Sequence, residues 1–256
     1  MKTLLKIGGS ILTKADGAKV VVSSLKRIAK EISSAWQDCY VGGINKLVLV
    51  HGAGYCGHPE ADKYKLNEGL TDTKGIYDTH RAVSKLNSIF LDILSDEGLS
   101  VVPIHPLNMI AANDGRIIYL DLNCIDKALR NDILPVIHGD VVFDDTRGCC
   151  IVSGDQIINY LARRLDVDKV GLATNVDGVY LNGTFLEKIN NENIQMVFNQ
   201  KYLPGKTHDV TGGMLGKIKE LWDLPVESII FNGQVDGNIR QFLAGENLKG
   251  TVIRRI

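Results

Sequence analysis

Two patterns of apolar residues alternate along the chain. Short runs rich in β-branched residues predict buried strands, and longer stretches with apolar residues at every third or fourth position predict amphipathic helices. The clearest helical stretches are Ser24–Trp36, Gly75–Glu97 and Asp155–Leu165. The runs that predict strands are Thr3–Ile7, Lys46–Val50, Ser100–Ile104, Leu134–Ile137, Lys169–Ala173, Ser228–Phe231 and Gly250–Arg254.

The alternation of strands and helices predicts an α/β fold with a mainly parallel central sheet that helices cover on both faces. The chain has 256 residues, which fits one large domain or two closely packed lobes. Two shorter segments, Tyr119–Asp126 and Phe143–Ile151, are expected to form hairpin-like insertions. No internal repeat and no low-complexity linker divides the chain.

Composition and charge narrow the function classes. The formal net charge is -1, which gives the whole chain no electrostatic attraction to nucleic acid or to an anionic membrane. No apolar run reaches the roughly 18 residues of a membrane-spanning helix, and the N-terminal segment lacks the features of a signal peptide. The five cysteines form no Cys-x-x-Cys pair, so neither a disulfide framework nor a zinc site is indicated, and a cytoplasmic location is expected.

Glycine-rich segments follow four of the predicted strands. Open α/β sheets bind their ligands beyond the carboxyl ends of the strands, where the chain turns into a helix. The recurrence of glycine at these positions predicts a large polyanionic ligand that several backbone loops hold together. The four segments are Lys6–Ser10, His51–His58, His138–Asp140 and Thr174–Gly178.

The first segment combines Lys6 with the pair Gly8 and Gly9. Glycines let backbone N–H groups approach phosphate oxygens, and a nearby lysine can neutralise charge on a transferring phosphoryl group. A tight turn with an ordinary strand lysine explains the same residues equally well. This segment alone therefore leaves both interpretations open.

The second segment matches the Gly-x-Gly-x-x-Gly pattern of a dinucleotide-binding turn from Gly52 to Gly57. That turn requires a second strand that ends in an acidic residue about 20 residues later, whereas residues 67–72 are polar and turn-like. A second phosphate-binding loop facing the first is the favoured interpretation. His58 follows before Pro59, at the expected start of a helix, where its ring N–H can bind an anion; an ordinary surface or core histidine is the alternative.

Two further segments each open a helix. Asp155 is expected to be a carboxylate that caps or stabilises the first turn of its helix, one that orients two active-site lysines, or both, because an Asp at a helix N-terminus can also face the catalytic cleft. The segment Asp209–Ile218 resembles a Walker A loop, but it has one residue too few between its glycines and Ile218 replaces Ser or Thr. It still predicts an anion site at a helix N-terminus near Lys217, with an ordinary capped helix as the alternative.

Taken together, these motifs resemble the amino acid kinase family. In order they are Lys-x-Gly-Gly-Ser, a second glycine-rich loop, Gly-Asp, Ser-Gly-Asp, Val-Asp-Gly-Val-Tyr and Asp-Val-Thr-Gly-Gly-Met-x-x-Lys. Within that family, His51–Pro59 is similar to the archaeal isopentenyl phosphate kinases. The resemblance implies one open αβα sandwich over residues 1–256, usually paired as a homodimer. Its acceptor-binding lobe is expected at about 1–165 and its nucleotide-binding lobe at about 166–256.

The same resemblance implies an activity, the ATP-dependent phosphorylation of isopentenyl phosphate to isopentenyl diphosphate in a mevalonate-type isoprenoid route. ATP and Mg²⁺ are the implied cofactors, with Mg²⁺ bound through the nucleotide phosphates and no metal site of the protein's own. The implied catalytic residues are Lys6, Lys14, His58, Asp155 and Lys217. The implied ATP-binding residues are Lys6, Gly8, Gly9, Ser10, Gly54, Asn175, Asp177, Gly178, Gly212, Gly213 and Lys217.

An acceptor site completes the expectation. The resemblance implies that Ala53, Gly57, His58 and Gly154 bind the acceptor phosphate. An isopentenyl tail needs a small apolar pocket nearby, and the helix after the second glycine-rich loop is the nearest element able to supply its wall. Its residues Ile76, Tyr77 and Val83 are therefore expected to line that pocket. The alternatives are a kinase for another small phosphate, phosphonate or carbamate acceptor, and a nucleotide-binding protein without turnover.

Overall fold

An eight-stranded, mainly parallel sheet forms the centre of the computed structural model, which describes residues 1–16, 19–39, 45–200 and 213–255. Only β16 runs antiparallel to its neighbour β15 within this sheet, and β14 follows the direction of β16. In spatial order the strands are β14 (Lys188–Ile189), β16 (Gly250–Ile253), β15 (Ser228–Asn232), β11 (Lys169–Thr174), β1 (Lys2–Ile7), β4 (Lys46–His51), β8 (Leu134–His138) and β5 (Val101–Ile104).

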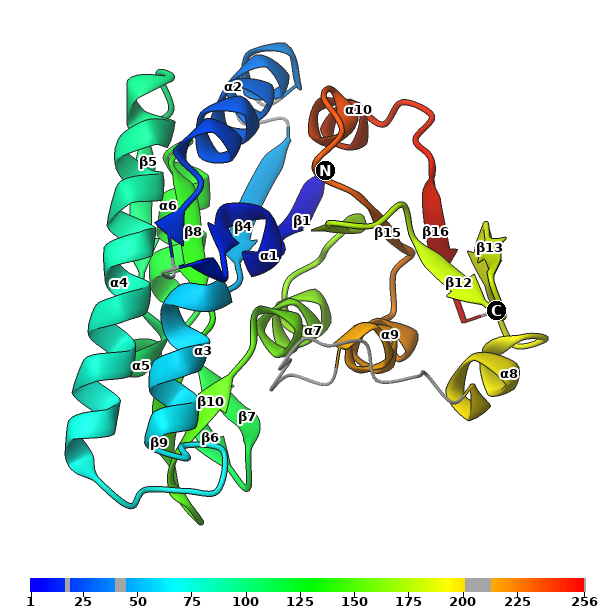
Figure 1. Cartoon of the computed structure of the whole chain (residues 1–256). Helices are drawn as coiled ribbons and strands as arrows, with labels where there is room; N and C mark the ends of the chain where they lie inside the picture. The colour runs from blue at the N-terminus through cyan, green and yellow to red at the C-terminus, as the bar shows by residue number, and fades with distance from the viewer. Residues whose placement is uncertain (17–18, 40–44, 201–212, 256) are drawn as a thin grey trace.

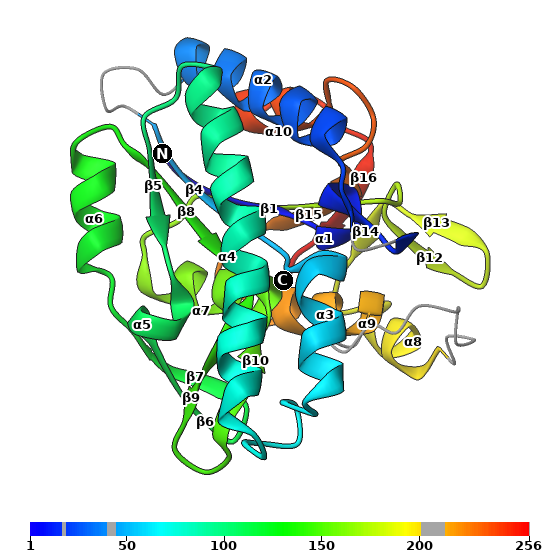
Figure 2. The same ribbon diagram turned by 60° about the vertical axis from the view of Figure 1, so that its left-hand side comes forward.

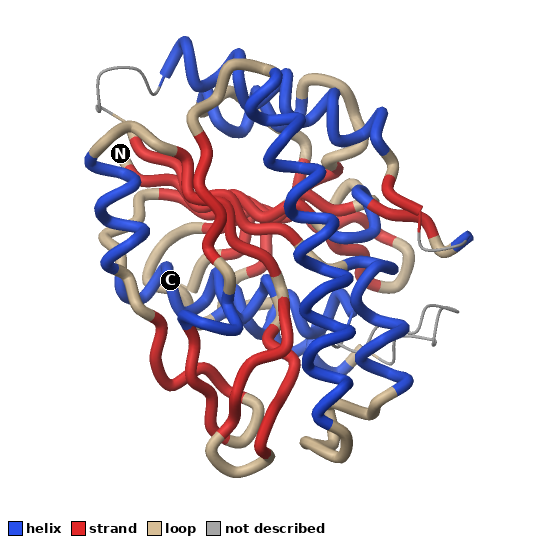
Figure 3. The backbone as a smooth tube through the Cα atoms, turned by 90° about the vertical axis from the view of Figure 1, so that its left-hand side faces the viewer, coloured by secondary structure: helices blue, strands red, loops and turns tan. Residues whose placement is uncertain are grey.

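Helices cover both faces of this sheet (Figures 1 and 3). One face packs against α2 (Val22–Cys39), α4 (Thr73–Asp96) and α10 (Asn238–Ala244). The opposite face packs against α6 (Asn123–Arg130), α7 (Gly154–Arg164) and α9 (Gly213–Trp222). Each helix buries the apolar face that its periodicity predicts, which confirms the expected α/β architecture. None of the described helices is both long and apolar enough to cross a membrane.

The sequence-based expectations for these elements are confirmed with one exception. All seven predicted strands and all three predicted helices are present, with ends within a few residues of those expected. The insertion predicted at residues 143–151 is the hairpin of β9 (Asp140–Asp144) and β10 (Gly148–Val152). Short elements complete the chain: α1 (Gly9–Leu12), β2 (Thr13–Lys14), β3 (Lys19–Val20), α3 (Gly54–Lys63), α5 (Pro106–Met109), β12 (Val179–Leu181), β13 (Thr184–Leu186) and α8 (Ile194–Asn199).

The hairpin predicted at residues 119–126 is wrong. The hairpin lies earlier, between β6 (Ile110–Asn113) and β7 (Arg116–Leu120), and α6 begins at Asn123. Asp114 and Gly115 turn this hairpin with positive φ angles of 48° and 77°. An Asp-Gly pair adopts this conformation readily and is a strong hairpin signal, which the sequence analysis overlooked.

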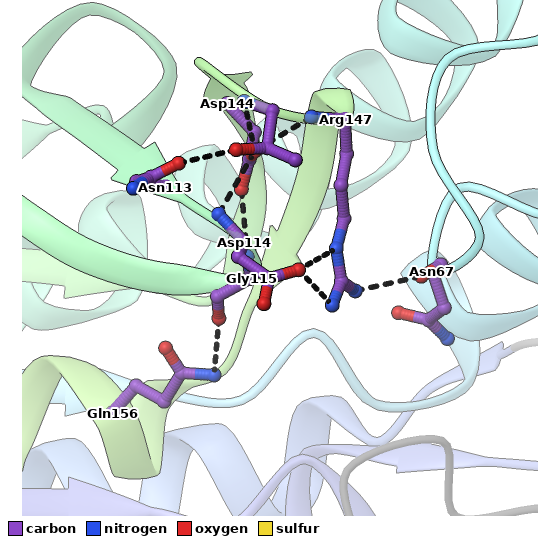
Figure 4. Close-up of polar contacts among 8 residues, drawn as sticks. Asn67, Asn113, Asp114, Gly115, Asp144, Arg147 and Gln156 are labelled. Atoms are coloured by element: carbon purple, nitrogen blue, oxygen red, sulfur yellow. Dashed lines mark hydrogen bonds and ion pairs between the residues drawn. The ribbon is translucent and has the colours of Figure 1, made fainter.

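The two hairpins join into a second, four-stranded sheet of order β10-β9-β6-β7 (Figure 2). One carboxylate, Asp144, holds the two hairpin turns together (Figure 4). It is 4 % exposed and accepts backbone N–H groups of Asp114, Gly115, Thr146 and Arg147 at 2.7–3.1 Å. Burial would raise the pKa of Asp144, but these N–H donors outweigh it and lower the pKa to about 2.

The same turns are attached to the loop between α3 and α4. The Arg147 guanidinium donates to Asp114 Oδ1 at 2.6 and 2.9 Å and to the Asn67 carbonyl at 3.2 Å (Figure 4). In return, the Leu70 N–H donates to the Arg147 carbonyl at 2.8 Å. The small sheet therefore fixes the far ends of α3 and α4 relative to the strands.

Asp144→Asn is expected to lower the free energy of unfolding by about 2 kcal/mol near neutral pH, because a hydrogen bond to a charged group contributes roughly 1.5–3 kcal/mol. The pKa of Asp144 is depressed, so its stabilisation is present above the ordinary carboxyl pKa and is lost as the pH falls toward 2. The difference between variant and wild type should therefore shrink between about pH 4 and pH 2. Urea unfolding at several pH values measures this. The exposed neighbour Asp145→Asn is the control, and equal stability of the two variants would contradict the role of Asp144.

Candidate functional site

The carboxyl ends of four parallel strands meet at one cavity of about 310 Å³. Gly8 follows β1, Gly52 follows β4, Gly139 follows β8 and Thr174 ends β11, and all four line the cavity. The strands bring them together because Ile7 is in register with both His51 and Ala173. Helices α1, α3, α7 and α9 lie around this end of the sheet (Figure 1).

Two glycine-rich loops form one wall of the cavity and touch each other. A Cβ on Gly9 would lie 2.3 Å from the backbone nitrogen of Gly54, so neither loop tolerates a side chain at this contact. Gly54 also has a positive φ of 54°. Buried Thr13 links the loops, because its hydroxyl donates to the Gly9 carbonyl and accepts the Tyr55 N–H, both at 2.9 Å.

The second loop runs directly into α3, which starts at Gly54 rather than at His58 as expected. Ala53 has no side chain that could cap this helix, and the Thr13 hydroxyl accepts the Tyr55 N–H of its first turn. The remaining backbone N–H groups of the first turn and the positive end of the helix dipole lie at the cavity. Gly57 and His58 line the cavity one turn later. This is a suitable position for the phosphate of a small ligand.

A buried carboxylate and two lysines form the opposite wall. Asp155 accepts a hydrogen bond from Lys6 Nζ at 2.6 Å, and Lys217 Nζ lies 3.5 Å from its other oxygen. Burial would raise the pKa of Asp155, yet the charges and hydrogen bonds of the two lysines outweigh it and keep the pKa below its ordinary value. Two ammonium groups therefore meet at one carboxylate on this wall, and ammonium groups are suitable donors for an anion.

The structure is compatible with both interpretations of Asp155, because the residue lies in the first turn of α7 and also contacts the two lysines. Ser153 is the N-cap of α7, and its hydroxyl accepts the Gln156 N–H at 3.2 Å. Asp155 lies in the first turn, with its side chain on the lysines. The adjacent Gly154 leaves room for this arrangement, because a Cβ there would lie 3.0 Å from Lys6 Cε and the lysine side chain would have to shift.

An apolar part of the cavity continues from His58 along α3, α4 and the β10 strand. Ala61, Val83, Ile151 and Val152 line it, and Thr79 lies one helical turn before Val83 on α4. The cavity thus joins a positively charged, glycine-rich region to a small hydrophobic one, a combination typical of sites for amphipathic small molecules.

Two of the three residues expected to line the apolar pocket do not reach this cavity. Tyr77 is 62 % exposed on the outer side of α4. Ile76 lies on the same side of α4 as Val83 but two turns nearer to its start, where it packs against Leu66, Val141 and Cys149. Of the three, only Val83 lines the cavity.

Only some of the residues expected on the nucleotide side line the cavity. Ser10, Asn175 and Gly213 line the cavity, together with Val176 and Met214, which the sequence analysis did not single out. Gly178 is not among the lining residues. Asp177 also lies outside it, where Lys249 and Asn232 bind its carboxylate at 2.7 and 2.9 Å and lower its pKa. Lys14 is exposed on β2 and does not line the cavity, and Gly212 lies outside the described residues.

Some lining residues escaped the sequence analysis. Asp140 and Ile151 line the cavity and belong to segments that were noticed for other reasons. Thr13 does not line the cavity, but it links the two glycine-rich loops that do. Ile151 could have been found from the pairing of the predicted hairpin with the segment after His138. Thr13 carries no such signal, because a single hydroxyl between two loops leaves no sequence pattern.

Comparison with known proteins agrees with this geometry. A sequence profile of the amino acid kinase family matches residues 1–229. The chain belongs to the amino acid kinase family. The resemblance drawn from the motifs is thereby confirmed.

Similar proteins within this family include several isopentenyl phosphate kinases. The chain is 39% identical over 263 residues to that of Methanocaldococcus jannaschii, covering 99% of this chain and 98% of the relative. It is 38% identical over 269 residues to that of Methanothermobacter thermautotrophicus, with 98% of each chain covered. A crystal structure of an isopentenyl phosphate kinase superposes with a TM-score of 0.85 at 34% identity, covering 99% of this chain and 100% of the other.

Thr13→Val is expected to lower the free energy of unfolding by roughly 1–3 kcal/mol, because it leaves a buried N–H without its acceptor. Valine keeps the shape of threonine, so the change isolates the hydroxyl that joins the two glycine-rich loops. Thr13→Ser keeps that hydroxyl and is the matched control. Urea unfolding compares the two, and a valine variant as stable as the serine variant would show that the hydroxyl does not hold the loops.

Proposed function

We propose that this chain catalyses the ATP-dependent phosphorylation of isopentenyl phosphate to isopentenyl diphosphate. One observation carries the proposal: a single cavity joins two lysines and two glycine-rich loops to a small apolar region. The full-length similarity to isopentenyl phosphate kinases supports it.

The nucleotide would lie against the first glycine-rich loop and α9. Gly9 and Ser10 would bind its phosphates through backbone N–H groups, next to Gly8, whose own N–H donates to the Ala173 carbonyl at 2.8 Å. Asn175 and Gly213 also line the cavity. Lys6 and Lys217 would neutralise the charge on the transferring γ-phosphoryl group. Asp155 acts on the reaction only through these lysines, whose ammonium groups it orients.

The acceptor would lie between α3 and α7. Its phosphate would bind at the N-terminus of α3, next to Ala53, Gly57 and His58, with Gly154 opposite. This phosphate is already an anionic nucleophile, so the transfer requires no general base. Positioning and charge neutralisation suffice for an in-line displacement. The tail would occupy the apolar region beside Val83, where each buried methylene contributes about 0.8 kcal/mol.

Three further expectations belong to the proposal. Mg²⁺ would enter with the nucleotide and help to neutralise its phosphates. The residues at the cavity fit this arrangement, because they are lysines and N–H donors that bind phosphate, and the described part of the chain offers no group of three metal ligands.

The family resemblance supports a homodimer. None of the five cysteines, all of which lie in the described part of the chain, forms a disulfide, which suits a reducing cytoplasm.

Coupled ADP release across a panel of acceptors tests the function. With Mg²⁺-ATP, isopentenyl phosphate should give the highest kcat/KM, and isopentenyl diphosphate should appear in the product spectrum by ³¹P NMR. Fosfomycin, carbamate and geranyl phosphate complete the panel. Faster turnover of fosfomycin or carbamate would assign a different acceptor, and ATP binding without ADP release for any of them would indicate a protein without turnover.

Val83→Ala is expected to raise the kcat/KM ratio of geranyl over isopentenyl phosphate by roughly tenfold, because each extra methylene that fits contributes about 0.8 kcal/mol. The ATP KM should not change. Tyr77→Ala is the matched control on the same helix, since this side chain is exposed and does not line the cavity. An unchanged ratio in a folded Val83→Ala variant would place the tail elsewhere, and a raised ratio in Tyr77→Ala would return that residue to the pocket.

A further inference from the structure

Four of the six histidines gather beside the cavity, around the carboxylate of Asp140. His51 ends β4, His138 ends β8, His105 precedes α5 and His80 lies on α4. Ring centroids of neighbouring histidines lie 5.3–6.4 Å apart. The proposed phosphoryl transfer uses none of these rings.

Metal binding does not explain the cluster. Within the described residues no group of three His, Cys, Asp or Glu side chains could hold a metal ion. The rings bind each other and the backbone instead. His138 Nδ1 lies 3.2 Å from the Gly139 carbonyl, and its Nε2 lies 3.1 Å from His105 Nδ1. A neutral His138 satisfies both contacts, donating from Nδ1 and accepting at Nε2.

His80 forms the hydrogen bond to Asp140, whereas His138 Nδ1 lies 3.8 Å from the same carboxylate oxygen. His80 Nδ1 lies 2.7 Å from Asp140 Oδ2, and its Nε2 lies 3.2 Å from Ser84 Oγ. The hydrogen bond to Asp140 raises the pKa of His80, against the effect of burial. Burial lowers the pKa of His51 and of His105, and it lowers the pKa of His138 well below its usual range. Positive charge in the cluster is therefore concentrated on His80.

Asp140 lies where a negative charge would be harmful. Its side chain is fully buried, and the residue lines the same cavity as His58 and Val83. The cavity is suited to a ligand with a phosphate and an apolar tail. A carboxylate without a compensating positive charge would repel the phosphate and would be unfavourable beside the apolar tail. Burial raises the pKa of Asp140, and the hydrogen bond from His80 offsets this only in part. One additional proton, beyond the one that a neutral imidazole keeps, can lie either on His80 or on Asp140. In both cases the pair has no net charge.

We propose that the His80–Asp140 pair determines whether the cavity admits its anionic acceptor, because His80 cancels the charge of the buried Asp140 carboxylate. His80 is a positioning residue in this role, since it acts through Asp140 and not on the reacting atoms. The identity of the acceptor rests on the proposed function, whereas the charge balance of the pair does not.

The His80–Asp140 pair should make binding of the acceptor weaker as the pH rises. The groups that face His80 are Asp140 from β9, His105 from the start of α5 and His138 from β8, with Ser84 on its own helix. Because the pKa of His80 is raised, its attraction to Asp140 is complete below the ordinary imidazole pKa of about 6.5. That attraction is lost as the pH rises through the raised pKa. Above it the pair is negatively charged.

Steady-state kinetics of His80→Asn, Asp140→Asn and the double variant test the proposal. An asparagine amide at position 80 can still donate to Asp140, so the single change removes the charge and keeps the hydrogen bond. His80→Asn is expected to raise the acceptor KM at least tenfold and to leave the ATP KM unchanged. The double variant restores a neutral pair, so its acceptor KM should return to within about threefold of wild type.

The pH profile adds a readout that a structural role would not change. For wild type, kcat/KM for the acceptor should fall as His80 loses its proton, and this fall should be absent in the double variant. A double variant as impaired as His80→Asn would overturn the proposal. An ATP KM that rises together with the acceptor KM would also overturn it.

A titration without substrate separates this proposal from the function itself. The imidazole resonances of His80 in the unligated protein, followed by NMR, should give a pKa above that of His105, and Asp140→Asn should lower it. If these shifts appear but isopentenyl phosphate is not turned over, the proposed function alone fails. If His80 titrates at or below the ordinary imidazole value, the charge-cancelling role is wrong.

Discussion

The arrangement of the site depends on one buried carboxylate that holds two ammonium groups. Asp155 receives Lys6 from the central strand β1 and Lys217 from α9, two elements far apart in the sequence. Each of these charges would be unfavourable if it were buried alone, and together they offset one another. The start of α7, the carboxyl end of β1 and the first turns of α9 must therefore meet at one point, and the cavity forms where they meet.

The rest of the architecture supports that meeting point from two sides. Parallel strands bring their glycine-rich ends to the same edge of the sheet, so backbone N–H groups face the lysines. Close contact between Gly9 and Gly54, together with the Thr13 hydroxyl, keeps the two loops at a fixed separation. On the other side, the small sheet held by Asp144 attaches to the loop between α3 and α4, the helices that carry His58 and Val83. The lysines and their carboxylate thus lie on β1, α7 and α9, whereas the acceptor side also includes α3 and α4.

Local patterns were sufficient to predict the strands, the main helices and the glycine-rich strand ends. They were sufficient because apolar periodicity and strand–helix alternation determine these features locally. The failures have specific physical causes. The turn at Asp114 and Gly115 was overlooked, which moved a hairpin by several residues. Tyr77 was expected in the apolar pocket because it lies near His58 in the sequence. It is exposed instead, because successive positions on a helix point in different directions. The His80–Asp140 contact joins residues 60 positions apart and has no motif.

The most direct test of this account is the kinetics of Asp155→Asn, with folding verified by circular dichroism. Asparagine keeps the shape of the side chain but releases both lysines from its charge. If Asp155 orients these lysines toward the transferring phosphoryl group, kcat should fall by about a hundredfold or more, while the ATP KM changes little. A folded variant with the kcat of wild type would contradict the account, because the lysines would then be positioned without the carboxylate.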